Sequence, residues 1–192
     1  MRNIGKYCMA LIFSLTVLMT FVSPQAHAEF PDRPVAFVVV DRHGSVDNSA
    51  FSSWRQVVKW AYHFPNYKLQ EDTSGAAAVL QAERKIGKTV LSQAAEAAGA
   101  DVIVVADILS MREDTLHGNI FRYYDYDDGP FVLVETRADL YVYKKDGAKF
   151  LRKRIREADV RDLGNYEKPV ERIKWALSKL VNTMEGRPII GE

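Results

Sequence analysis

The chain has 192 residues, and its 26 Lys and Arg side chains nearly balance its 25 Asp and Glu side chains, which gives a net charge of +1. A chain so close to neutral has no global field that would attract nucleic acid or an anionic membrane. Its single cysteine excludes an internal disulfide, and the sequence contains no fixed-period repeat and no low-complexity linker.

The first 28 residues have the pattern of a cleaved export signal. A short basic stretch is followed by a run of about 14 mainly apolar residues, 9–22, and then by Ala26-His27-Ala28, the small-residue pattern that signal peptidase recognises. The run is shorter than the roughly 20 residues needed to cross a bilayer, and Cys8 precedes it, whereas a lipid-attachment cysteine would follow it. We therefore expect a signal peptide at 1–28, cleaved after Ala28, and an exported protein that is soluble in the periplasm or secreted.

The remaining residues, 29–192, predict one domain of alternating strands and helices. Unbroken apolar runs at 35–40 and 102–105 are typical of strands buried on both faces, whereas strict alternation over 132–142 indicates a half-buried strand. In the first half of the domain the patterns predict a strand at 35–40, a helix capped by Asp47 or Asn48 and ended by Pro65, a short strand at 67–70, and helices at 74–85 and 90–98. In the second half they predict a strand from 102 towards Met111, a strand at 132–142, a turn at 145–147 and a strand at 149–159. A last helix, capped by Asn165, follows. The polar segment 112–130 is expected to be a long loop or a hairpin tip.

This order of elements predicts an α/β fold with a single three-layer domain. Strands that are separated by helices form parallel pairs with right-handed crossovers, and the last three strands form a meander. The two apolar strands belong at the centre of the sheet, while the short strand at 67–70 and the basic strand at 149–159 belong at its edges. We therefore expect a mixed five-stranded sheet in the order 2-1-3-4-5, with strand 4 antiparallel and helices on both faces.

Short segments of the chain carry a resemblance to a group of periplasmic α/β domains. Residues 97–108 (Ala-Ala-Gly-Ala-Asp-Val-Ile-Val-Val-Ala-Asp-Ile) resemble the group's helix end, Gly-x-Asp and apolar strand, and 143–147 followed by 149–156 resembles its strand, turn and return strand. The group comprises the amino-terminal domain of the Tol–Pal translocation protein, the curli-secretion lipoproteins and the lipoproteins that activate penicillin-binding proteins. Ala106 stands where the group commonly has glycine. The resemblance implies an envelope accessory domain that works by protein contact.

Polar residues at the carboxyl ends of the two central strands are the best candidates for ligand binding. In the order 2-1-3-4-5 the chain changes direction between strands 1 and 3, where open α/β sheets bind ligands. The candidates are Asp41, Arg42, His43, Asp47, Ser110 and Arg112. The two arginines suit a small anionic ligand. The alternative is structural: the aspartates cap the loop and the helix, and the histidine is solvated.

The segment 123–128 combines aspartates with tyrosines. Its carboxylates could hold calcium, although the full calcium-loop spacing and the distal glutamate are missing. Its aromatic rings could instead anchor a protein partner, and a solvated hairpin tip explains the same residues without either function. The candidate metal ligands are Asp125, Asp127 and Asp128, and the candidate protein contacts are Tyr123, Tyr124 and Tyr126.

Other charged and aromatic residues have competing explanations. The basic residues within 152–156 could contact anionic envelope polymers, but acidic residues follow directly, and a solvated edge strand is the simpler interpretation. Glu135, Arg137 and Asp139 share one strand face and are expected to form cross-strand ion pairs. The tryptophans expected in the core or partly buried on their helices are Trp54, Trp60 and Trp175.

Hydrophobic packing explains most of the patterned sequence, and no catalytic motif accompanies it. We therefore expect a non-catalytic accessory or adaptor protein of the cell envelope, acting on envelope proteins through protein–protein contacts, with no cofactor and no nucleic-acid partner. The alternatives are a small-anion-binding protein or enzyme that uses the crevice at the carboxyl ends of strands 1 and 3, and a calcium-dependent surface-binding domain.

Overall fold

The computed structural model describes residues 32–63, 65–116 and 131–188, which belong to one compact unit, Asp32–Glu192. The expected export signal and the aspartates and tyrosines of 123–128 lie outside the described residues. The elements are β1 (Arg33–Asp41), α2 (Asn48–Ala61), β2 (Tyr67–Leu69), α3 (Ser74–Ala82), α4 (Lys88–Ala97), β3 (Val102–Leu116), β4 (Phe131–Lys144), a short 3-10 turn (Asp146–Ala148), β5 (Lys149–Asp162) and α5 (Pro169–Met184).

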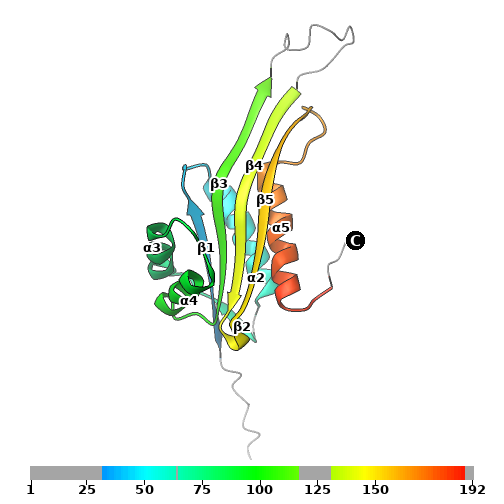
Figure 1. Ribbon diagram of the computed structural model, residues 1–192. Coiled ribbons are helices and arrows are strands. Elements are labelled where there is room, and N and C mark those ends of the chain that lie inside the picture. Colours follow the sequence, from blue (N-terminus) through cyan, green and yellow to red (C-terminus); the bar gives the residue numbers. More distant parts are fainter. Residues whose placement is uncertain (1–31, 64, 117–130, 189–192) are drawn as a thin grey trace, which may run out of the picture. The chain divides into compact units, whose positions relative to one another are not determined.

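The strands form one five-stranded mixed sheet in the order β2-β1-β3-β4-β5 (Figure 1). β1 pairs in parallel with β2 and β3, while β4 pairs antiparallel with β3 and β5. The α/β class, the strand order and the antiparallel fourth strand are therefore confirmed as predicted.

Helices cover the sheet on both faces, in two separate apolar clusters. On one face, α2 and α5 pack on alternate strand residues such as Val35, Phe37 and Leu140. On the other face, α3 and α4 pack on the intervening residues, such as Ala36 and Val38. The apolar run at 35–40 of β1 is packed on both faces in this way, as its composition predicts.

The strands β3, β4 and β5 continue well beyond the end of β1. Asp41, the last residue of β1, pairs with Ile108, and β3 then runs on to Leu116 against β4. The register shifts between Ile108 and Ser110, which leaves Leu109 as a bulge in β3. Residues 112–116, expected in a polar loop or hairpin tip, are strand and pair with residues 131–135 of β4.

The helix ends and two tryptophans depart from the sequence expectations. α3 ends at Ala82, before the expected residue 85, and α5 begins at Pro169, with Lys168 rather than Asn165 at its N-cap. Trp60 is 73% exposed and Trp175 is 59% exposed, so their expected burial is wrong. Each lies two positions from a buried residue of its helix, which at 100° per residue places it on the opposite side.

Trp54 is the tryptophan that the core depends on. It is 0% exposed, and its Nε1 donates a hydrogen bond of 2.9 Å to the carbonyl of Val170 at the start of α5. We expect Trp54→Ala to lower the free energy of unfolding by about 3–5 kcal/mol. The control, Trp175→Ala, should change it by about 0.5 kcal/mol or less. Urea unfolding followed by circular dichroism measures both, and equal losses would contradict this account of the core.

A nearly buried ion pair ties the carboxyl end of β4 to the end of α5. Lys144 Nζ lies 3.0 Å from Glu185 Oε2 and donates to Tyr67 Oη at 3.0 Å, and the charged side chains are 15% and 10% exposed. Burial lowers the pKa of the Lys144 ammonium, but its hydrogen bonds to Tyr67 and Glu185, together with the charge of Glu185, outweigh burial and raise that pKa above its ordinary value.

Removing only one partner of this pair should be costly. We expect Lys144→Met to lower the free energy of unfolding by about 3 kcal/mol, because the Glu185 carboxylate stays buried without its cation. The double variant Lys144→Met/Glu185→Leu should recover most of that loss, because no uncompensated charge remains. Chemical unfolding at pH 7 compares them, and a double variant as unstable as the single one would show that the ion pair itself holds α5 in place.

Candidate functional site

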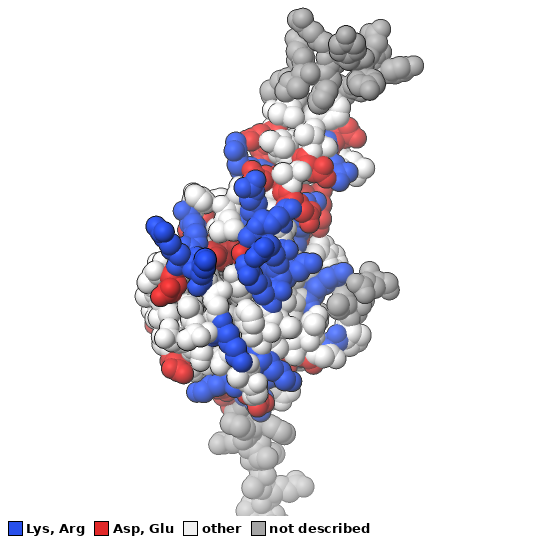
Figure 2. Space-filling model, in the orientation of Figure 1, with Lys and Arg blue, Asp and Glu red and all other residues white. Residues whose placement is uncertain are grey.

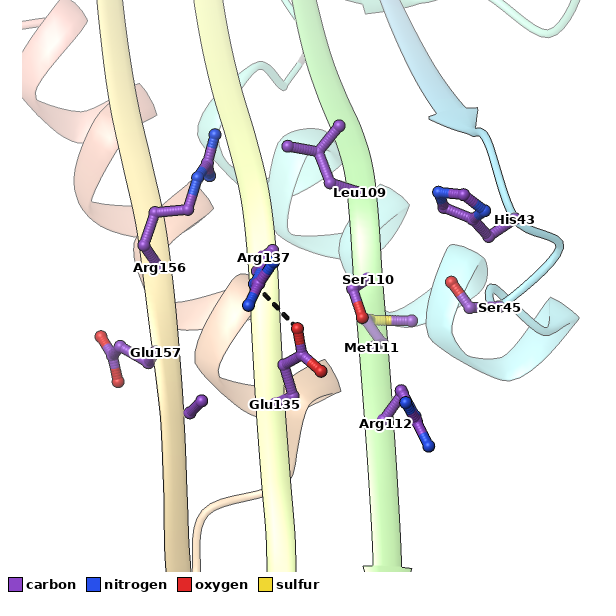
Figure 3. A pocket seen from close by; sticks show the side chains of 11 residues that line it. His43, Ser45, Leu109, Ser110, Met111, Arg112, Glu135, Arg137, Arg156 and Glu157 are labelled. Atoms are coloured by element: carbon purple, nitrogen blue, oxygen red, sulfur yellow. Dashed lines mark ion pairs between the residues drawn. The ribbon is translucent and has the colours of Figure 1, made fainter.

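A groove of about 800 Å³ lies beside the end of β1, on the sheet face that carries α3 and α4 (Figure 3). The groove is lined by His43, Ser45, Leu109, Ser110, Met111, Arg112, Glu135, Arg137, Arg156, Glu157 and Ala158. These residues come from the loop after β1 and from β3, β4 and β5, so four separate stretches of the chain build the site.

Strand register places the polar side chains of the groove in rows across the sheet. Ser110 of β3 lies opposite Arg137 of β4, which lies opposite Arg156 of β5. Directly opposed residues of an antiparallel pair point to the same face, so these three side chains share the groove. In the next row, Arg112 lies opposite Glu135, and Figure 3 shows the ion pair that Glu135 makes with Arg137, 2.8 Å apart.

Asp41 folds the loop that brings His43 and Ser45 to the groove. Its carboxylate accepts hydrogen bonds from the backbone N–H groups of Val46, at 2.7 Å, and His43, at 3.1 Å. Ser45 Oγ also donates to this carboxylate, at 3.4 Å. Partial burial raises the pKa of the Asp41 carboxyl, but the N–H groups of this loop outweigh burial and lower it below its ordinary value. The loop is thus organised by one ionised carboxylate.

The structure brings together some of the predicted ligand-binding residues and not others. His43, Ser110 and Arg112 line the groove. Asp47 instead caps α2, accepting a hydrogen bond of 2.7 Å from the N–H of Ala50. The residues that point to structural partners rather than lining the groove are Asp41, Arg42 and Asp47.

Asp139, for which the sequence predicted cross-strand ion pairs but no functional role, is a further functional candidate. It is 5% exposed, and in the sheet it lies directly opposite Asp107, which is also 5% exposed and pairs with Arg42 at 3.0 Å. Asp139 Oδ2 lies 3.0 Å from Arg152 Nη2 and 2.9 Å from Arg156 Nη2, and Asp139 Oδ1 lies 3.6 Å from Arg154 Nε. Three of the basic residues of β5, which was expected to be a solvated edge, therefore converge on one buried carboxylate.

The sequence indicated this arrangement only through arginines at alternate positions of one strand. Arginines at every second position of a strand share one face, and the basic residues within 149–159 follow that spacing at Arg152, Arg154 and Arg156. Which carboxylate they meet depends on the register between β4 and β5, which a single strand pattern does not contain.

Metal binding and membrane insertion find no support in the part of the chain that is described. Within 32–63, 65–116 and 131–188, no group of three or more His, Cys, Asp or Glu side chains is arranged to hold a metal ion. No helix among those residues has the length and apolar character that crossing a membrane requires. Calcium binding by Asp125, Asp127 and Asp128 concerns residues outside these ranges and stays a prediction.

Comparison with known proteins gives likeness only among solved structures. No known protein family matches the chain, and no curated protein matches it. The hypothetical protein CT253 from Chlamydia trachomatis matches with 14% identity and a TM-score of 0.38, over 81% of this chain and 94% of that one. The lipoprotein GNA1162 from Neisseria meningitidis matches with 9% identity and a TM-score of 0.38, over 80% and 99%. A minor lipoprotein from Acinetobacter baumannii matches with 6% identity and a TM-score of 0.30, over 79% and 87%.

The role assigned to Asp41 predicts a pH-dependent effect. We expect Asp41→Asn to lower the free energy of unfolding by about 1.5 kcal/mol at pH 7, because the carboxylate accepts charged hydrogen bonds there. A lowered folded-state pKa gives stability that is present above the unfolded pKa of about 3.9 and is lost as pH falls through the folded value. The gap between variant and wild type should therefore close in acid.

Unfolding titrations between pH 7 and pH 2 test this effect. Glu96→Gln, which removes the charge of an exposed carboxylate on α4, is the control, and it should change stability by about 0.5 kcal/mol or less. A stability gap at position 41 that stays constant down to the lowest pH would contradict the proposed role of the ionised carboxylate.

Proposed function

We propose that this chain is an exported accessory protein of the cell envelope that binds a partner protein through the groove beside β1 and catalyses no reaction. The observation that carries the proposal is the groove itself. It has a volume of about 800 Å³, and four chain segments line it with charged and polar side chains. The export pattern of 1–28 and the resemblance of 97–108 to the Tol–Pal group of envelope domains support the same conclusion.

The charged groups of the groove suit recognition better than proton transfer. Arg137 pairs with Glu135 at 2.8 Å, Arg112 pairs with Asp114 at 2.8 Å, and Arg156 pairs with Asp139. A general acid or base must exchange its proton with a substrate, whereas these carboxylates are already engaged in ion pairs with guanidinium groups. Charged groups that are held in fixed positions make a surface selective for a partner with complementary charges.

A second candidate, the binding of a small anion in the same groove, is favoured by one observation. Ser110 and Arg112 of β3 and His43 of the β1–α2 loop line one part of the groove (Figure 3). Hydroxyl, guanidinium and imidazole groups are donors that bind phosphate or carboxylate. Nuclear magnetic resonance titration with inorganic phosphate distinguishes the candidates, because amide shifts at Gly44 and Ser110 would favour the small anion.

Site-specific photo-crosslinking tests the adaptor proposal in the cells that produce the protein. With a photoreactive phenylalanine analogue at position 112, we expect a discrete crosslinked product after irradiation, because that side chain is 61% exposed at the groove. The added substitution Ser110→Trp should reduce the product about tenfold by filling the groove, a loss of about 1.4 kcal/mol in binding.

Cleavage of the expected signal peptide after Ala28 should leave a mature protein that begins at Glu29.

The matched control places the same photoreactive residue at position 175. Trp175 is exposed on α5, which packs on the other face of the sheet. Identical products from positions 112 and 175, or a product at 112 that survives Ser110→Trp unchanged, would count against a partner that docks in the groove.

A further inference from the structure

Three arginines at alternate positions of β5, here called the arginine ladder (Arg152, Arg154 and Arg156), surround the buried carboxylate of Asp139. All three guanidinium groups have a nitrogen within 3.6 Å of an Asp139 oxygen. The ladder adjoins the groove, and Arg156 belongs to both. Figure 2 shows Lys and Arg side chains gathered over the middle of β4 and β5, beside the region that α3 and α4 cover.

The ladder carries more positive charge than its buried partner neutralises. Guanidinium groups remain protonated in proteins, so three positive charges face one negative charge. The other buried carboxylate in this part of the sheet, Asp107, is already paired with Arg42 at 3.0 Å. Like charges brought together at a partly buried surface repel each other unless an anion joins them. The ladder therefore has the charge balance of an anion-binding site.

Side-chain contacts hold the ladder in place while leaving it open to solvent. The Arg152 guanidinium lies over the ring of Tyr141, 5.5 Å from its centroid, and that ring stacks on Phe150. Arg156 Nη1 donates to the carbonyl of Ala138 at 2.9 Å. The arginine side chains are nonetheless 37%, 58% and 36% exposed along the strand. Because these side chains are already ordered, binding a ligand costs them less conformational entropy.

Spacing and relief determine which anion fits. Alternate residues of a strand are about 6.6–6.8 Å apart, so the backbone of the ladder extends over about 13 Å, whereas its three guanidinium groups converge on Asp139. α3 and α4 stand on the same sheet face, and a helix with its side chains is about 10 Å thick. The two helices project above the sheet and keep a flat membrane away from the sheet surface beside them. A thin linear polymer, in contrast, can lie along the strand.

We propose that the arginine ladder binds a linear anionic glycopolymer, one with a phosphate or a carboxylate on successive repeating units. Polymers of this kind lie outside the cytoplasm, where the export pattern of 1–28 directs the chain. Asp139 acts as a positioning residue that gathers the three guanidinium groups at one place on the strand. The site adds to the proposed protein-binding groove, and its ligand is measured separately from the crosslinked partner.

Isothermal titration calorimetry on the full mature chain tests the proposal. The probes are polygalacturonate, which carries carboxylates, and poly(glycerol phosphate), which carries phosphates. We expect at least one polymer to bind at low ionic strength, to weaken as salt is added, and to bind at least about tenfold more tightly than its monomer. The stronger of the two polymers identifies the anionic group.

Matched arginine variants separate the ladder from general positive charge. Arg154→Gln should weaken polymer binding about fivefold or more, because Arg154 is 58% exposed and makes only a long contact with Asp139. Arg161→Gln removes an arginine that is 56% exposed on the same strand but paired with Asp159, and it should change binding less than twofold. Thermal unfolding of both variants verifies that each one folds.

Four results would overturn the assignment. Equal losses in Arg154→Gln and Arg161→Gln would show nonspecific attraction. Monomers that bind as tightly as polymers would indicate a site for one small ion. Equal affinity for phosphatidylglycerol vesicles would indicate a membrane surface, and equal affinity for single-stranded polythymidylate of the same charge would indicate a nucleic-acid site. If no partner crosslinks at position 112 but polymer binding is retained, only the proposal that a protein partner docks in the groove would be refuted.

Discussion

The register of β4 between β3 and β5 is the constraint on which the site depends. It places Asp107 opposite Asp139 and Asp139 opposite Arg154, and it carries the pairing on past the end of β1. Because the side-chain period of a strand is two, a slip of one residue would move Glu135, Arg137 and Asp139 to the face that α2 and α5 cover. The alternating apolar residues of β4 prevent that slip, since Ala138, Leu140 and Val142 are buried on that face.

Burial of Asp139 turns this register into a binding surface. A carboxylate removed from water needs a charged partner or several hydrogen bonds, and one arginine would meet that need. The sequence supplies arginine at three alternate positions of β5, so neutralising the carboxylate also assembles an excess of positive charge. The interaction that stabilises the strand pair and the interaction that attracts an anion are therefore the same interaction. The near-zero net charge of the whole chain does not reveal it, because the opposite charges lie elsewhere on the surface.

The sequence predicted the sheet because its signals are local. The apolar run at 35–40 and the alternation over 132–142 each define a strand and its burial without reference to a partner. The groove was predicted in part, since strand order alone puts His43 and Ser110 near each other. Asp139 was predicted to form cross-strand ion pairs, and it does, but the sequence could not name its arginine partners, because they follow from the pairing of two strands. The exposure of Trp60 and Trp175 was missed for a related reason: large aromatic residues were assigned to the core by type, although the helical spacing of the buried residues around them already places both outside it.

The open face of the sheet follows from the length of two helices. α3 has 9 residues and α4 has 10, so each spans at most about 15 Å, whereas the 14 residues of β4 span about 47 Å. The two helices pack closely, because Gly75 of α3 lies so near α4 that a Cβ atom there would come within 2.8 Å of the Ala97 carbonyl oxygen. Close packing keeps both helices over β1, β3 and the Tyr141 end of β4. The two short helices therefore cover one part of this sheet face, and the part that carries the arginines around Asp139 stays partly exposed to solvent.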